Sequence, residues 1–254
     1  MRHGYAAVYH DQGSGEFSRA ALTVALAERF DVRRIYAREI IASDAWQEHT
    51  ALLAFPGGAD LPYCASLNGA GNASIRRYVE AGGALLGVCA GAYYVSSRIA
   101  FEPESPGAIT GERDLALFAG TAHGSLHDLA EPYSLEHLRC AGLATLRACA
   151  TGERLRALYW GGPELIPDDG ARYTPLFEYE SPARLAALRT QVGQGQVVLC
   201  GVHAEVSGAQ LAIEGSRFGD DSFEHGMRLS RELGRVEAER RRLFELLLDA
   251  FDHQ

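Results

Sequence analysis

The sequence predicts an α/β fold with a central, mostly parallel sheet. Ala84–Val88 is a short apolar run between Gly82-Gly83 and a glycine-rich turn, which is typical of a central strand covered on both faces. Strand–loop–helix units occur in succession over residues 51–97, and such units imply parallel pairing with right-handed crossovers. The chain has 254 residues, of which 47% are hydrophobic and 22% charged, as in ordinary globular domains. We therefore expect one domain over residues 1–254.

Composition also limits the classes of function. The formal net charge of -9 argues against nucleic-acid binding, because phosphate neutralisation needs a basic face. Apolar runs are far shorter than the ~20 residues that a bilayer span needs, and no signal-peptide core follows Met1. We expect a cytoplasmic protein with a small-molecule or protein partner. The five cysteines are irregularly spaced and lack a C-x-x-C pair, which indicates reduced thiols, neither disulfides nor a zinc site: Cys64, Cys89, Cys140, Cys149 and Cys200.

The first residues are predicted to form a strand, a helix and a second strand, at 5–10, 18–30 and 32–36. Leu22, Leu26 and Phe30 share one face of that helix. Gly13 and Gly15 begin a G-x-G-x-x-G pattern whose third glycine is replaced by Ser18, so a dinucleotide-binding fingerprint is incomplete. We expect a tight turn there and no cofactor.

A second loop follows the next strand. Ala51–Phe55 reads as a buried strand, and Pro56-Gly57-Gly58 directly after it makes a loop whose backbone amides can face a ligand. Asn72–Ala81 is the helix that leads into the strand at 84–88. Because ligands gather at the carboxyl ends of parallel strands, we expect Gly57-Gly58 and the turn after residue 88 at one edge.

That turn has the spacing of a nucleophile elbow. Gly87, Cys89 and Gly91 form G-x-C-x-G, in which glycines let strand and helix approach closely while one side chain stands clear. The positive end of the following helix favours a thiolate, the reactive form of cysteine. The alternative is that Cys89 is a small buried hydrophobe.

Residues 93–180 carry weaker signals. The elbow helix is predicted to continue to Ser97, and strands are predicted at 115–118, 155–160 and 174–179. His123 and His127 are four residues apart, but Gly124 lies between them and no third ligand is evident, so surface histidines are favoured over a metal site.

A hairpin is predicted from Leu188–Val192 and Gln196–Val202, and it runs into His203-Ala-Glu205. Because side chains alternate on a strand, Cys200 is expected in the core while His203 and Glu205 share the other face. A carboxylate within reach of an imidazole suits a catalytic pair. It also suits a strand-end histidine bonded to an acid.

The final stretch, residues 228–251, has apolar residues at helical spacing and is predicted to be one covering or dimer-forming helix. Glu237 and Arg241 can pair at i, i+4, and residues 240–242 are expected on a solvated face.

These signals together supply the parts of nucleophilic acyl transfer. Cys89 is the predicted nucleophile, His203 the base and Glu205 its orienting carboxylate. Backbone amides near the elbow are predicted to bind the oxyanion, and neighbouring side chains to line the substrate pocket. The predicted oxyanion residues are Gly57, Gly58 and Ala90, and the predicted substrate-binding residues are Asp60, Tyr63 and Tyr93.

With these motifs the chain resembles the class I glutamine amidotransferases, and more closely the amidotransferase-like N-terminal domain of eukaryotic-type biotin–protein ligases. The resemblance implies a flavodoxin-like, three-layer fold and a Cys-His-Glu triad at Cys89, His203 and Glu205. The segments that carry it are Pro56–Cys64, Leu67–Gly69, Gly87–Tyr93, Ser96–Arg98, Tyr159–Gly162 and Gly201–Glu205.

The resemblance implies a hydrolase or amidotransferase that acts on a carboxamide such as glutamine. No Gly-Arg-Gly-Arg-x-Gly adenylate loop occurs in the sequence, so we expect no biotin ligase activity from this chain itself. Two alternatives stay open: a non-catalytic binding or regulatory module that keeps the fold, and a glutaminase subunit that feeds a partner synthetase.

Overall fold

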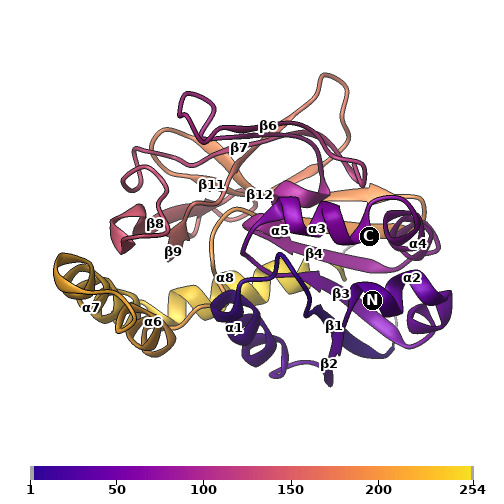
Figure 1. The fold of residues 1–254 in the computed structure, drawn as a ribbon, viewed down its shortest axis with the longest axis horizontal. Helices are drawn as coiled ribbons and strands as arrows, with labels where there is room; N and C mark the ends of the chain where they lie inside the picture. Colours follow the sequence, from indigo (N-terminus) through magenta and orange to yellow (C-terminus); the bar gives the residue numbers. More distant parts are fainter. Residues whose placement is uncertain (1–2, 253–254) are drawn as a thin grey trace.

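The computed structural model describes residues 3–252 (Figure 1). Its centre is a nine-stranded sheet with the order β2-β1-β3-β4-β13-β12-β11-β8-β9. The first five strands are parallel: β2 (Val32–Ile35), β1 (Tyr5–Tyr9), β3 (Thr50–Phe55), β4 (Ala84–Val88) and β13 (Gly195–Cys200). The others run antiparallel to their neighbours: β12 (Arg184–Val192), β11 (Thr174–Tyr179), β8 (Ala141–Ala148) and β9 (Arg154–Trp160).

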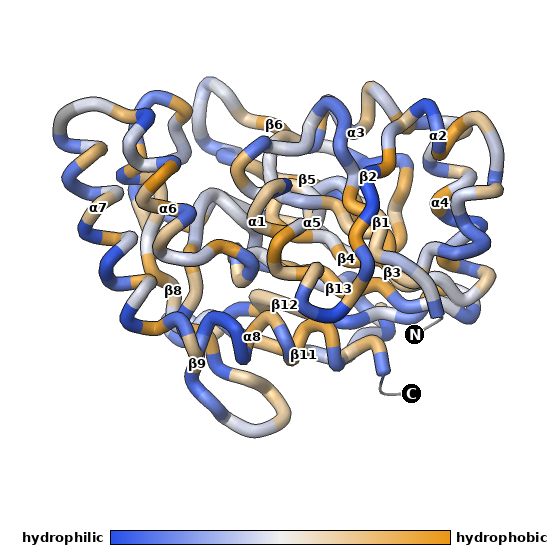
Figure 2. Tube along the Cα trace, turned by 90° about the horizontal axis from the view of Figure 1, so that it is seen from below, coloured by the Kyte–Doolittle hydropathy of each residue, from blue (hydrophilic) through white to orange (hydrophobic). Residues whose placement is uncertain are grey.

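Helices cover both faces of the parallel strands. Alternation on β4 sends Leu86 and Val88 into one core and Leu85 into the other. The first core is covered by α1 (Glu16–Leu26) and α8 (Glu237–Asp249). The second is covered by α2 (Ala37–Ala42), α3 (Asp60–Leu67), α4 (Ala70–Glu80) and α5 (Ala90–Val95). The hydrophobic residues follow the central strands in Figure 2, and the α/β, three-layer prediction is confirmed.

A second, four-stranded sheet was not predicted. Its order is β10-β7-β5-β6, and Ile99 and Phe118 from it join the core under α5. The strands are β5 (Ser96–Phe101), β6 (Ile109–Glu112), β7 (Phe118–Gly124) and β10 (Glu164–Pro167). Figure 1 shows this sheet beyond α5, on the side of the central sheet opposite α1 and α8.

The remaining helices lie at the β8–β9 edge of the molecule. α6 (Gly208–Gly215) and α7 (Asp220–Arg235) share a small core with Leu138 and Leu158. Two short 3-10 helices span Asp44–Gln47 and Leu138–Cys140. Within residues 3–252, no helix has the length and apolarity that crossing a membrane requires.

Four predicted elements are wrong. The helix predicted at 18–30 spans Glu16–Leu26, so Phe30 lies beyond its end. The elbow helix ends at Val95, not Ser97, because Ser96 begins β5 and pairs with Phe118 of β7. Residues 115–117 are not a strand: Leu115 and Leu117 are buried in a loop. The apolar run therefore indicated burial correctly but not a strand.

The predicted C-terminal helix is two helices. Val236 has φ -112° and ψ 21°, which separates α7 from α8. Arg240 is also buried at 5% exposure, and the prediction of a solvated face fails at that residue. Both helices have apolar faces, so the spacing of apolar residues did not reveal the break.

Candidate active site

Cys89 stands at a sharp strand-to-helix turn. β4 ends at Val88, α5 begins at Ala90, and Cys89 between them has φ 51° and ψ -108°. Its amide donates to the Cys200 carbonyl at 2.8 Å. Gly91 is needed for the close approach, since a Cβ there would lie 2.3 Å from the Phe55 carbonyl oxygen. The left-handed backbone is a strained conformation of the kind that clusters at functional sites.

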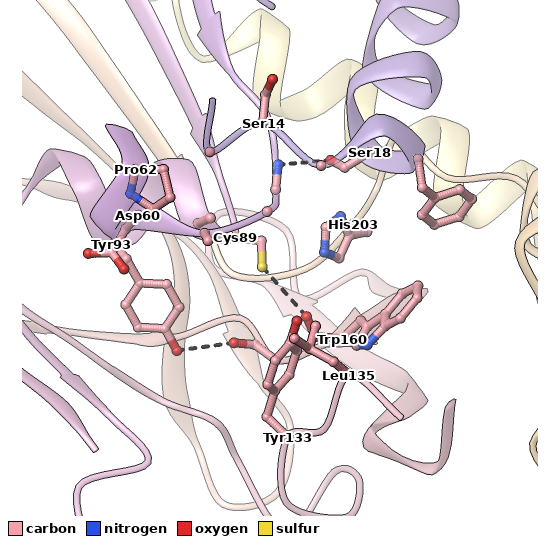
Figure 3. Close-up of a pocket in the computed structure, with 18 of the residues that line it drawn as sticks. Ser14, Ser18, Asp60, Pro62, Cys89, Tyr93, Tyr133, Leu135, Trp160 and His203 are labelled. Carbon is pink, nitrogen blue, oxygen red and sulfur yellow. Dashed lines mark hydrogen bonds between the residues drawn. The ribbon is translucent and has the colours of Figure 1, made fainter. Parts of the chain in front are cut away.

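His203 and Glu205 lie just beyond the end of β13, and the structure brings them to this turn. His203 Nδ1 and Glu205 Oε1 are 2.8 Å apart, and both side chains are almost fully buried. The His203 amide donates to the Leu158 carbonyl at 2.8 Å, which fixes the residue against β9. The imidazole lies beside the Cys89 sulfur (Figure 3), and both residues line one cavity. The three predicted triad residues therefore converge from β4 and the segment after β13.

The electrostatics of this group favour an imidazolium. Burial opposes the charged ring, but the negative charges of Glu205 and Cys89 and the hydrogen bond to Glu205 outweigh it, and the pKa of His203 is raised well above 6.5. An imidazolium beside the sulfur stabilises a thiolate.

Ser18 on α1 is a functional residue that the sequence analysis missed. Its buried hydroxyl donates to Glu205 Oε1 at 2.9 Å and accepts from the Gly57 amide at 2.8 Å. Ser18 therefore ties the carboxylate of the triad to the Pro56-Gly57-Gly58 loop. Its position soon after the first parallel strand is the available signal, but in the sequence pattern Ser18 stands out only as the residue that replaces the third glycine of a dinucleotide fingerprint.

The bond to Ser18 corrects the prediction for Gly57. Its amide is already used, so it is not free to bind an oxyanion. Gly57 instead packs on the imidazole, since a Cβ there would lie 2.5 Å from His203 Cε1. The roles of Gly58 and Ala90 stay predictions: Gly58 lies beside Ser14 in a short β-bridge, and Ala90 is the first residue of α5, whose amide has no partner within the helix.

A cavity of about 600 Å³ opens beside the sulfur (Figure 3). Asp60 and Tyr93 lie in its wall as predicted, but their polar groups are engaged. Asp60 Oδ2 accepts from Arg113 Nε at 2.6 Å, and the Tyr93 hydroxyl donates to the Gly161 carbonyl at 3.1 Å.

Tyr63 is not a pocket residue. It is fully buried, its hydroxyl donates to the Pro56 carbonyl at 2.8 Å, and its ring packs on Tyr9, Phe55 and Tyr94. On α3 it faces the core, whereas the neighbouring Asp60 and Pro62 face the cavity.

The loop after β9 forms another side of the site. The Cys89 thiol donates to the Trp160 carbonyl at 3.5 Å, and Trp160 and Gly161 line the cavity. Burial raises the pKa of the other four thiols, that of Cys200 to about 12. Cys200 is fully buried in the core, as predicted.

The two histidines considered for a metal site lie apart from the cavity. His123 on β7 contacts Glu164, and His127 beyond that strand contacts Glu102, each at 2.9 Å. They do not lie on a shared helix. Both side chains are partly exposed.

Residues 6–253 match the sequence profile of the family described as biotin-protein ligase, N terminal. The chain belongs to this biotin-protein ligase N-terminal family. An uncharacterized protein of Chlamydia muridarum is 35% identical over 210 residues, which cover 78% of this chain and 79% of that protein. The biotin–protein ligase of Schizosaccharomyces pombe is 32% identical over 175 residues, which cover 66% of this chain and only 27% of the ligase.

Solved structures support the fold of this member of the biotin-protein ligase N-terminal family. A glutamine amidotransferase from Thermotoga maritima has a TM-score of 0.62 at 12% identity and covers 100% of both chains. A glutamine amidotransferase from Methylobacillus flagellatus has a TM-score of 0.58 at 14% identity, covering 98% of this chain and 94% of that one. The fold is therefore of the class I glutamine amidotransferase type.

Proposed function

We propose that this chain hydrolyses a carboxamide such as glutamine through a cysteinyl thioester at Cys89. The observation that supports it best is the position of His203, which bonds Glu205 and lies beside the Cys89 sulfur at the edge of a cavity. Nucleophile, base and orienting carboxylate are the parts of a catalytic triad.

The first half-reaction makes the thioester. The Cys89 thiolate, paired with the His203 imidazolium, forms a bond to the carbonyl carbon, and an electron pair of the carbonyl double bond moves to the oxygen. The amides of Gly58 and Ala90 are the proposed donors to the tetrahedral oxyanion. As the carbon–nitrogen bond breaks, His203 gives its proton to the nitrogen, which leaves as ammonia.

The second half-reaction releases the acid. Neutral His203 takes a proton from a water molecule that attacks the thioester carbon, and the carbon–sulfur bond breaks to release the acid and return the thiolate beside the imidazolium. Glu205 keeps the ring oriented throughout, since its carboxylate accepts from Nδ1 while the opposite side of the ring faces the sulfur.

Ammonia release from primary carboxamides, glutamine among them, tests the proposal. Cys89→Ala should lower turnover by at least about 10³-fold, because the nucleophile is lost. Cys149→Ala, at a half-buried cysteine that does not line the cavity, is the matched control and should keep full activity. Turnover that survives in Cys89→Ala would refute the mechanism. A wild-type protein that releases no ammonia would favour the binding-module alternative.

A further inference from the structure

One side of the cavity beside Cys89 is apolar. The second sheet and the loop over residues 133–135 supply it, and they present no charged side chain to the cavity. The side chains are Ile99, Phe101, Ile109, Tyr133 and Leu135. Burial raises the pKa of Tyr133 to about 12, so its phenol stays neutral in ordinary buffers.

This wall is a packed surface. The rings of Phe101 and Tyr133 meet edge to face with centroids 5.3 Å apart, and Phe101 meets Tyr93 in the same way at 5.6 Å. The buried carboxylate of Glu102 accepts from the Tyr133 amide at 3.0 Å and contacts His127 at 2.9 Å, which anchors the loop that carries Tyr133. Leu135 stands at the rim with 81% exposure.

The charged side chains lie elsewhere in the cavity. Asp60 is neutralised by Arg113, and Arg217 Nη1 is 3.1 Å from Glu214 Oε2. Glu16, at the start of α1, lies on the same side of the cavity as Ser18. A substrate group that rests on the apolar wall finds no partner for an ammonium or a carboxylate there, and burying an unpaired charge is costly.

The position of the imidazole decides which part of the substrate rests on that wall. His203 protonates the leaving nitrogen, so the leaving group lies on the His203 side of the sulfur. Figure 3 shows His203 and Tyr93 on opposite sides of Cys89, with Tyr133 and Leu135 near the sulfur and away from Ser18. The acyl part of the substrate therefore lies toward Tyr93, Phe101 and Tyr133.

We infer that the site takes carboxamides whose acyl part ends in a bulky apolar group, aliphatic or aromatic, in preference to glutamine. The inference rests on the proposed function and names its substrate class. A cavity of about 600 Å³ is in the range that encloses ligands well above the size of an amino acid. Burial of an apolar group on this wall supplies binding energy that the charged end of glutamine does not.

Aldehydes test this without requiring turnover, because the Cys89 sulfur adds reversibly to the aldehyde carbon and the rest of the aldehyde occupies the acyl side. Protection of Cys89 from iodoacetamide is measured by peptide mass spectrometry with 4-phenylbutanal and butanal. Protection by 4-phenylbutanal should need about tenfold less aldehyde. The same preference is expected in ammonia release, with 4-phenylbutanamide above glutamine in kcat/KM.

Two variants locate the subsite. Leu135→Asp should remove the advantage of 4-phenylbutanal, while Ile41→Asp, at an exposed apolar residue outside the cavity, should leave it unchanged. Equal protection by the two aldehydes in the wild type, or equal loss in both variants, would overturn the apolar subsite but keep the nucleophile. If neither aldehyde protects Cys89 and no amide releases ammonia, the proposed function itself fails.

Discussion

At the residue scale, the candidate site depends on two side chains, His203 and Ser18, each of which lies between two other groups of the site. His203 bonds Glu205 and lies beside the Cys89 sulfur, and Ser18 bonds Glu205 and the Gly57 amide. The chain Gly57–Ser18–Glu205–His203–Cys89 therefore runs from the loop after β3 to the sulfur. Each member can be tested through a change that leaves the others in place.

Glu205→Gln should change the pH dependence of thiol reactivity. The amide oxygen can still accept from His203 Nδ1, but the charge that raises the pKa of the ring is gone. Because its pKa is raised, His203 stays protonated at neutral pH and loses its proton only as the pH rises through that pKa. In the variant the ring loses its proton at a lower pH. Alkylation of Cys89 by iodoacetamide near neutral pH should slow by about tenfold. Superimposable pH profiles would contradict the assignment of Glu205.

Ser18→Ala should affect both stability and turnover. It leaves the buried Gly57 amide without an acceptor and removes one donor from Glu205 Oε1. An unsatisfied buried donor costs about 1–3 kcal/mol, which urea unfolding measures. Turnover should fall in kcat more than in KM, because the carboxylate is less firmly held. The exposed control Ser216→Ala should stay within about 0.5 kcal/mol of the wild type; an equal effect of the two variants would show that Ser18 has no special role.

At the scale of elements, α8, which covers the same face of the central sheet as α1, contacts the segment that carries His203 and Glu205. Arg240 on α8 is buried, its Nη1 donates to the Ala204 carbonyl at 2.5 Å, and its Nη2 bonds Glu237 Oε1 at 2.6 Å. Ala204 lies between His203 and Glu205 in the chain. Arg240 therefore holds the segment that places both catalytic side chains.

Arg240 and its neighbour Arg241 form a matched pair for a test. Arg241 Nε also bonds Glu237 Oε1, at 3.0 Å, but its side chain is 55% exposed and, among residues 3–252, makes no bond to residues 203–205. Arg240→Leu should lower the free energy of unfolding by about 2 kcal/mol and reduce turnover. Arg241→Leu should cost less than about 0.5 kcal/mol and keep activity. Equal effects would mean that Arg240 acts only through its surface ion pair.

Elements with a strong local pattern were predicted well. The apolar runs of β1, β3 and β4 and the hairpin of β12 and β13 are confirmed, as is the Glu237–Arg241 pair. The break at Val236 and the early end of α5 were missed, because packing against other elements decided them. Burial of Arg240 was missed for the same reason, since a basic run carries no information about what packs above it.

At the scale of the whole molecule, the order of strands carries the site. Parallel pairing of β3, β4 and β13 brings the loops that follow them to one edge, so Gly57, Cys89 and His203 meet although they are far apart in the chain. This convergence could be predicted from three strand–loop motifs. The second sheet, β8 and the way in which β8, β9 and β11 pair could not, since the sequence pattern does not say which strands lie side by side, and the apolar wall of the cavity was therefore missed.

The central claim is that the Cys89 sulfur becomes acylated during turnover. The most direct measurement is peptide mass spectrometry of wild-type protein quenched in acid while it turns over a primary carboxamide. The account predicts an acyl adduct on the peptide that contains Cys89, absent from Cys89→Ala. Ammonia release with no adduct on that peptide, or with an adduct at another residue, would contradict it.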